Sequence, residues 1–273
     1  METSASPKPQ IAPKPELPAF CRLLIEVLKP DKIYCMQQQF IGEAESSCLL
    51  LVVLQPSCTR AFTEMQPYLE LAGIGYGNCL IVKPNYLVQK LQQGHVFYSM
   101  ICRKDNLLYD TGKHKDFQSF APGEQSLVLE RARLVFEAQF QAALHCYEGC
   151  FFFLQDPQTL GLALFMLHQS AELCLRAVII FLCGRERRSH EVRILQQCAA
   201  QYLPAFAQVF STHKPEDIAL LKKLDDAYTE GRYATVYSIS DEDLEMLTKR
   251  VDTLHLLASE VVEVLTNGCL VLK

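Results

Sequence analysis

The spacing of hydrophobic and polar residues differs between the two halves of the chain. In the first half, short apolar runs alternate with stretches whose apolar residues recur every three or four positions. The short runs are typical of buried strands and the periodic stretches of amphipathic helices. The pattern predicts helices at 19–29, 59–73 and 85–94, a helix or strand at 95–106, and strands at 32–36, 48–55, 78–84 and 107–112. Strands alternating with helices indicate an α/β domain.

Beyond residue 120 the spacing is helical throughout. Gly184 follows one periodic segment as its expected C-terminal residue, and Ser240 precedes another as an N-cap with Asp243 three residues on. No strand pattern of similar strength occurs there, so this half is predicted to be an all-helical bundle. The predicted helices are 126–155, 158–184, 190–206, 215–231 and 240–267.

The chain of 273 residues exceeds the ~100–200 residues of a typical single domain. Residues 1–18 contain five prolines, which favour an extended and flexible arm. The change of pattern near residue 118 predicts an α/β domain at 19–118 and a helical domain at 119–273. Together these make a protein of the α+β class.

Composition narrows the class of protein further. Hydrophobic residues make up 49% and charged residues 21%, and the formal net charge is −5. A strongly basic nucleic-acid-binding surface is not indicated by these totals, no DNA-specific motif occurs, and a local basic patch stays open. The apolar runs are too short or too interrupted to span a bilayer, and the first residues lack the apolar core of a signal peptide. We therefore expect a cytoplasmic protein that contacts no membrane.

The twelve cysteines lie singly inside apolar runs such as "ESSCLLLVV", and no C-x-x-C pair occurs. This spacing argues against a zinc ribbon or a dithiol redox motif. We expect buried free thiols, no bound metal and no cofactor.

Polar residues interrupt the apolar segment "FMLHQSAELCLRAVIIFLCG" at a spacing near one per helical turn. At ~100° per residue, His168 falls at the edge of the apolar stripe, and Glu172 and Arg176 step away from it. One interpretation is the flank of an amphipathic helix with a local Glu172–Arg176 ion pair. The other is a binding site. The stripe consists of Leu164, Leu167, Ala171, Leu175 and Val178.

Two later segments offer residues that suit a phosphate or a base. "GRERRSHEVRIL" places four arginines around His190, and "AYTEGRYATVY" places Arg232 among three tyrosines, Tyr228 included. Arginine supplies planar charged donors, and tyrosine supplies stacking faces. Both segments are equally compatible with loops that only connect and cover helices.

These three segments together resemble the HEPN domain (higher eukaryotes and prokaryotes nucleotide-binding). Its members show an H-Q-x-x-E-x-x-L-K/R-A helix, a histidine at the next helix start and an A-R-Y element near the last helix. The matching positions are His168, Gln169, Glu172, Leu175, Arg176, Ala177, His190, Arg232 and Tyr233. The resemblance covers about 125–265. It implies a ligand-binding surface made of His168, Glu172, Arg176, Arg185, His190, Tyr228, Arg232 and Tyr233.

HEPN domains often follow a minimal nucleotidyltransferase domain, and the order of elements in 19–118 is similar to that family. Active members carry Gly-Ser after the first strand and D-x-D at the second, which hold triphosphate and magnesium. Here those positions read Met36 with Gln37 and Ser47 with Leu49. The resemblance therefore implies a nucleotidyltransferase-like domain with a small mixed sheet that does not bind magnesium.

HEPN domains that cleave RNA carry R-x(4–6)-H late in the bundle. Two matches occur, Arg185 with His190 and Arg250 with His255. The first lies in a loop, and five residues turn a helix by ~140°, which separates the side chains of the second. Arg250 and His255 are thus weak catalytic candidates.

Three functions stay open: a non-catalytic protein that binds a nucleotide or RNA, a metal-independent ribonuclease, and a protein that only mediates assembly. The absence of carboxylates at the expected magnesium-binding positions favours the non-catalytic binding protein. Residues 126–155 are apolar on more than one face, which predicts a homodimer.

Overall fold

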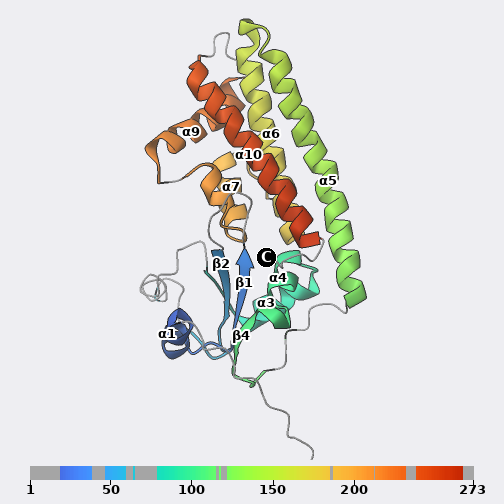
Figure 1. The fold of residues 1–273 in the computed structure, drawn as a ribbon, viewed down its shortest axis with the longest axis vertical. Helices are drawn as coiled ribbons and strands as arrows, with labels where there is room; N and C mark the ends of the chain where they lie inside the picture. The colour runs from blue at the N-terminus through green and yellow to red at the C-terminus, as the bar shows by residue number, and fades with distance from the viewer. Residues whose placement is uncertain are drawn as a thin grey trace, which may run out of the picture.

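The computed structural model describes residues 19–38, 47–59, 64, 79–114, 117, 122–184, 187–211, 213–231 and 238–266. Within these residues, a small sheet with three helices forms one end of an elongated molecule, and a bundle of long helices forms the other (Figure 1). The predicted arm at 1–18 and most of the predicted helix at 59–73 lie outside the described residues.

The sheet is mixed and contains four described strands in the order β3-β2-β1-β4. Strand β1 is antiparallel to both of its neighbours, and β2 is parallel to β3. The strands predicted from the sequence and the small mixed sheet are confirmed. Their bounds are β1 (Lys32–Gln38), β2 (Ser47–Val53), β3 (Cys79–Val82) and β4 (Leu107–Asp110).

Side chains of the strands alternate between two hydrophobic cores. One face packs against α1 (Ala19–Leu28), where Leu24 meets Ile33, Leu50 and Val52. The opposite face contributes to a larger core that continues into the bundle. Its strand residues include Tyr34, Met36, Leu49, Leu51 and Val53. The chain then forms α3 (Pro84–Gln92) and α4 (Val96–Ile101), so the ambiguous segment at 95–106 begins as a helix.

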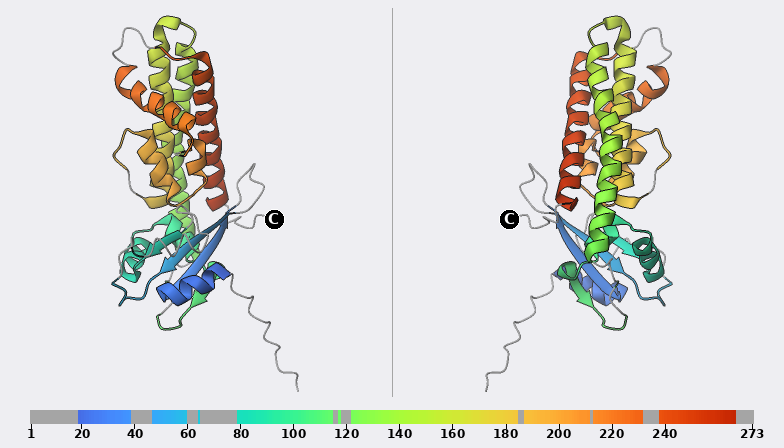
Figure 2. Two further views of the ribbon diagram at one scale, coloured as in Figure 1. Left: turned by 90° about the vertical axis from the view of Figure 1, so that its left-hand side faces the viewer. Right: turned by 90° about the vertical axis from the view of Figure 1, so that its right-hand side faces the viewer.

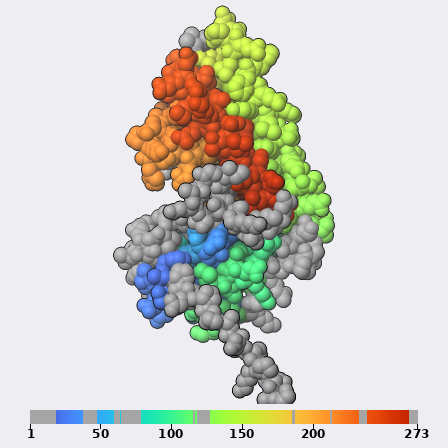
Figure 3. Space-filling model, in the orientation of Figure 1, coloured from blue at the N-terminus to red at the C-terminus, as the bar shows by residue number. Residues whose placement is uncertain are grey.

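The bundle is all-helical, as predicted. The segment expected to be one helix at 190–206 forms α7 (Val192–Ala200), and α8 (Phe206–Val209) begins only after Pro204, which disfavours helical geometry in the residue before it. Figure 2 shows α5 running along the bundle down to α4, and Figure 3 shows α5 and α10 forming neighbouring parts of one surface. The helices are α5 (Pro122–Phe153), α6 (Leu160–Cys183), α7 (Val192–Ala200), α8 (Phe206–Val209), α9 (Pro215–Glu230) and α10 (Asp241–Thr266).

Helix α6 is the centre of the bundle and packs against α5, α7, α9 and α10. His168 was expected at the edge of its apolar stripe and Glu172 further from it, and both lie deeper in the protein than these positions suggest. They are only 0% and 2% exposed, because neighbouring helices cover most of α6 and leave one stripe of it partly exposed. An apolar character round most of the helix is what such burial requires.

The expectation that the longest apolar runs are too short or too interrupted to span a bilayer is wrong for one segment. The segment Pro157–Cys183 is long and apolar enough to cross a membrane by length and composition, and 67% of its apolar window is buried within the protein.

Local signals at helix ends are confirmed. Gly184 ends α6 with a positive φ of 65°, and its N–H bonds to the Ile180 carbonyl. Ser240 precedes α10, where its Oγ accepts from the Asp243 N–H at 3.2 Å and donates to the Asp243 carboxylate at 2.8 Å.

The expectation that the cysteines are free thiols is wrong for one pair, since Cys35 and Cys48 form a disulfide between β1 and β2. Antiparallel pairing places Cys35 opposite Leu50 and Cys48 opposite Gln37, which brings the two cysteines onto adjacent strands. Separate apolar runs in the sequence do not reveal that register. Nine further cysteines in the described part of the chain are free.

Candidate ligand-binding site on α6, α7 and α9

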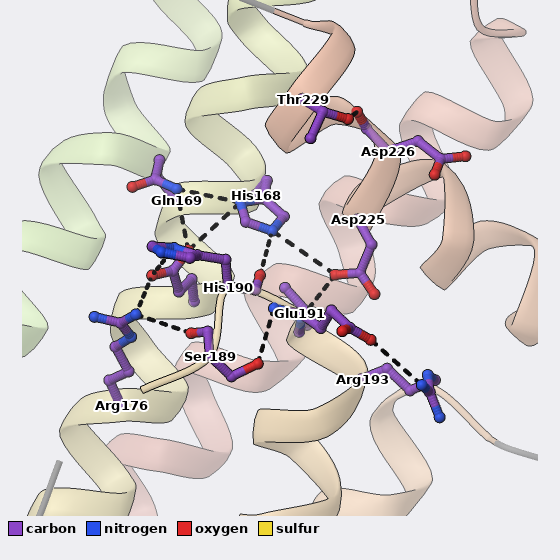
Figure 4. A network of polar contacts seen from close by, with 12 residues as sticks. His168, Gln169, Arg176, Ser189, His190, Glu191, Arg193, Asp225, Asp226 and Thr229 are labelled. Carbon is purple, nitrogen blue, oxygen red and sulfur yellow. Dashed lines mark hydrogen bonds and ion pairs between the residues drawn. The ribbon is translucent and has the colours of Figure 1, made fainter. Parts of the chain in front are cut away.

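A polar network joins α6 to the residues that precede α7 (Figure 4). The carboxylate of Glu172 on α6 is its centre. Its Oε1 lies 2.9 Å from Arg176 Nη2 and 3.2 Å from His190 Nδ1, and its Oε2 accepts from Gln169 Nε2 at 3.2 Å. Gln169 and Arg176 lie three and four residues away on the same helix face. The Glu172–Arg176 ion pair predicted from the spacing is confirmed, and three donors surround a carboxylate that is almost fully buried.

His168 points into the protein and holds the chain that follows α6. Its Nε2 lies 2.9 Å from the carbonyl oxygen of His190, and its Nδ1 lies 3.2 Å from Gln169 Nε2. A carbonyl oxygen only accepts, so we assign the ring hydrogen to Nε2 and the acceptor role to Nδ1. His168 is therefore a positioning residue with no access to solvent.

Two further contacts fix the connection between α6 and α7. Arg176 Nη2 donates to the Ser189 carbonyl at 2.8 Å. Asp225 on α9 accepts the Val192 N–H at 2.7 Å, and its Oδ1 is 3.7 Å from His168 Nε2. A carboxylate at the first N–H of a helix satisfies a donor that has no partner inside the helix. Residues 189–192 are thus held from both α6 and α9.

His190 is the part of the network that faces solvent. Its side chain is 56% exposed, its Nδ1 is held by Glu172, and its ring stacks on Tyr228 at 4.6 Å and 15°. Among the described residues no hydrogen bond to its Nε2 is present. The imidazole is presented at the surface in a fixed orientation.

Charged groups of both signs lie around this imidazole. Arg187 and Arg188 are exposed just before it, whereas Arg193 pairs with Glu191 at 3.3 Å. A cavity of about 610 Å³ lies between α7 and α9 on the Asp225 side and includes the Asp226 carboxylate. Phosphate is therefore better matched by the arginine side of His190 than by the carboxylates of this cavity.

Comparison with known proteins identifies this region. Residues 156–261 match the model of the HEPN domain family. Over this range the chain is similar to HEPN domains, and the matched residues are called the HEPN domain below. A comparison with curated protein sequences finds no significant match. The matched range includes α6, α7, α9 and most of α10, and with them all the residues of the network around Glu172.

The HEPN domain brings together five of the eight binding residues predicted from the sequence: His168, Glu172, Arg176, His190 and Tyr228. Arg185, Arg232 and Tyr233 lie outside the described residues. Asp225 was not predicted from the sequence, although it lies three residues before Tyr228 and so shares its helix face.

The weak catalytic candidates of the HEPN domain do not meet within the chain. Arg250 Nη2 lies 2.8 Å from Asp217 Oδ1 on α9, whereas His255 Nε2 lies 2.9 Å from Ser170 Oγ on α6. The His255 ring packs edge-on against an aromatic residue of α5, Tyr147, at 5.0 Å. Burial lowers the pKa of His255 to about 4. Each candidate thus has a structural partner of its own.

In the part of the chain that the structure describes, no three histidine, cysteine, aspartate or glutamate side chains are grouped in a way that would hold a metal ion.

Proposed function

We propose that the HEPN domain binds a nucleotide or RNA, without reacting with it, at the surface around His190. The observation that carries this proposal is the exposed imidazole, held by Glu172 and stacked on Tyr228. Flat stacked rings suit a base, and the exposed guanidinium groups of Arg187 and Arg188 suit the phosphates. His168 and Asp225 support the proposal indirectly, because they fix the backbone that presents His190.

Binding of labelled single-stranded RNA tests the proposal. We expect the protein to bind at about 50 mM salt and more weakly at about 200 mM, because phosphate contacts release counterions. The variants His190→Ala and Arg187→Ala/Arg188→Ala should each weaken binding. Arg133→Ala is the matched control, since Arg133 is an exposed arginine on α5, outside the network. Failure of the wild-type protein to bind at low salt would contradict the proposal.

A metal-independent ribonuclease is the second candidate, and the contact between Glu172 and His190 favours it. A carboxylate that holds Nδ1 leaves Nε2 available for proton transfer, as in other catalytic carboxylate–histidine pairs. If this candidate is right, RNA is cleaved in the presence of a metal chelator and His190→Ala abolishes cleavage. His255→Ala should retain it once the lower stability of that variant is taken into account. If the wild-type protein does not cleave RNA, the ribonuclease candidate is wrong and non-catalytic binding remains the proposed function.

We further infer that residues 19–118 form a nucleotidyltransferase-like domain without nucleotidyl-transfer activity. Support comes from the mixed sheet and from the side chains at the positions where metal-binding oxygens are expected. Met36 and Leu49 are apolar and only 1% and 0% exposed. With magnesium and radiolabelled triphosphates, we expect no transfer of label to RNA or to the protein. Transfer of label would contradict this inference.

We also propose that the protein is a homodimer. Support comes from large apolar side chains exposed along α5, among them Leu134 at 54% and Phe152 at 68%. Such a surface is commonly covered by a second copy. Light scattering at micromolar concentration should give twice the chain mass for wild type and the single mass for Leu134→Asp. Ile218→Asp on α9 is the control and should remain dimeric. A monomeric wild-type protein would disprove the proposal.

A further inference from the structure

A cavity of about 450 Å³ lies where the sheet end of the molecule meets the bundle. It shares no residue with the network around His190. Its walls come from β3, from the start and body of α3, from α4 and from the turn after α7. The lining residues are Leu80, Ile81, Val82, Lys83, Tyr86, Tyr98, Gln201 and Tyr202.

Three tyrosine rings from separate elements line this cavity. The Tyr98 ring lies edge-on to Tyr86 at 6.1 Å and 88°, and edge-on to Tyr202 at 6.4 Å and 87°. Tyr202 is also packed against Phe97 at 5.1 Å. The rings are thus held by their neighbours before any ligand arrives. Tyr98 is only 3% exposed, so the flat surfaces open to a planar ligand are those of Tyr86 and Tyr202.

The tyrosine hydroxyls keep the wall electrically neutral. Burial raises the pKa of Tyr98 and of Tyr202 far above the usual range, so both stay protonated. Their neighbours act in the same direction, because Tyr86 raises the pKa of Tyr98 further and Cys183 raises that of Tyr202. The formal charge in the lining is that of Lys83, which is exposed. A neutral ligand body with any phosphate directed toward Lys83 fits this distribution.

Among the described strands β3 lies at the edge of the sheet, and its side away from β2 presents one donor and one acceptor next to each other. Leu54 N donates to the Val82 carbonyl at 2.9 Å, so Val82 is turned toward β2. In a parallel pair, alternate residues direct their N–H and C=O to opposite sides of the strand. Ile81 therefore directs both groups away from β2, and Ile81 lines the cavity.

We propose that this cavity binds a planar nitrogen heterocycle of the adenine class, as a second ligand site. The base lies among the tyrosine rings, its ring nitrogen accepts from the Ile81 N–H, and its amino group donates to the Ile81 carbonyl. The volume is near the lower end of ligand cavities, which span roughly 300–1,000 Å³, so a nucleoside is better matched than a larger cofactor. The proposal does not depend on the site around His190.

Equilibrium dialysis of the full-length protein with radiolabelled adenosine tests it. Adenosine carries no charge, so its binding should be saturable and the same at about 50 and 200 mM salt, unlike the binding of RNA phosphates. Purine riboside, which lacks the amino group, should bind more weakly. AMP should bind at least as well as adenosine, and ribose should not compete.

Variants on α3 place the ligand in this cavity. Tyr86→Ala should weaken adenosine binding by about tenfold or more, the effect of losing one stacking ring, whereas Tyr86→Phe should keep most of the affinity. Val88→Ala is the matched control, because Val88 is a similarly exposed side chain of α3 that does not line the cavity. His190→Ala should bind adenosine as wild type does, which separates this site from the proposed RNA site.

Three results would overturn the proposal. They are the absence of saturable binding up to millimolar adenosine, equal affinity of Tyr86→Ala and wild type, and loss of adenosine binding in His190→Ala. Crystals grown with adenosine give a second measurement: density between Tyr86 and Tyr202 supports the site, and density elsewhere or none at all contradicts it.

Discussion

The guanidinium of Arg250 on α10 lies 2.8 Å from the buried carboxylate of Asp217 on α9. The second oxygen of this carboxylate accepts the Ser211 N–H at 3.1 Å. One side chain therefore connects α10, α9 and the segment that precedes α9.

Removal of this carboxylate should destabilise the bundle. In Asp217→Ala, the partly buried guanidinium of Arg250 and the N–H of Ser211 both lose their partner, and we expect a loss of about 3 kcal/mol in the free energy of unfolding. Urea denaturation measures it. The control is Glu245→Ala, which breaks an exposed pair with Lys249 on α10 and should change stability little. Equal stabilities of the two variants would contradict the argument.

The buried imidazole of His255 predicts a pH dependence of stability. Its pKa is lowered by burial to about 4 in the folded protein, compared with about 6.5 in the unfolded chain. Between these values the unfolded state binds a proton that the folded state does not, so stability falls as pH drops from 6.5 to 4 and then levels off. The loss is on the order of 3 kcal/mol.

Urea denaturation at pH 7 and pH 4.5 measures this loss, with His255→Gln as the comparison. Glutamine keeps a hydrogen-bond donor for Ser170 and does not titrate. The variant should be less stable at pH 7 and lose less stability on acidification than wild type. Parallel losses in both proteins would assign the pH effect to other groups.

At Gly231 we expect that even one added methyl group destabilises the protein. A Cβ there would lie 2.5 Å from the backbone oxygen of Gly161, where the end of α9 meets the start of α6. Because backbone atoms cannot move aside cheaply, Gly231→Ala should cost about 2 kcal/mol or more. At Gly149 a Cβ would meet only the flexible Met166 side chain at 2.8 Å. Gly149→Ala should therefore be close to neutral by thermal unfolding, and a larger cost there than at Gly231 would refute the comparison.

Removal of the N-cap of α10 should cause a smaller loss of stability than the substitution of Gly231. Ser240→Ala removes the oxygen that accepts the Asp243 N–H, and we expect a loss of about 1 kcal/mol. Ser238→Ala, an exposed serine just before the cap, should be neutral. Chemical denaturation of both variants distinguishes the cap from a general serine effect.

The sequence alone predicted those features whose interacting residues lie within one or two helical turns of each other. Gly184 and Ser240 mark helix ends through bonds to residues three or four positions away. The contact between Glu172 and Arg176 also follows from spacing alone, since residues four apart face each other on a helix.

The features that could not be predicted from the sequence depend on contacts between segments that are far apart in the chain. Asp225 joins the site from another helix, 33 residues after the Val192 N–H that it binds. Periodicity cannot show how many helices pack against α6, and so the full burial of His168 was missed. The same limit explains the disulfide between Cys35 and Cys48, which requires the register of two strands.

The central place of α6 has a consequence for how the protein is synthesised. This helix is apolar enough to enter a bilayer, and its cover includes α10, which ends at Thr266. A ribosome that has completed α6 has still to produce about one third of the chain. During that interval the most apolar surface of the protein is incompletely covered, so its nascent chain should engage chaperones that bind exposed hydrophobic helices.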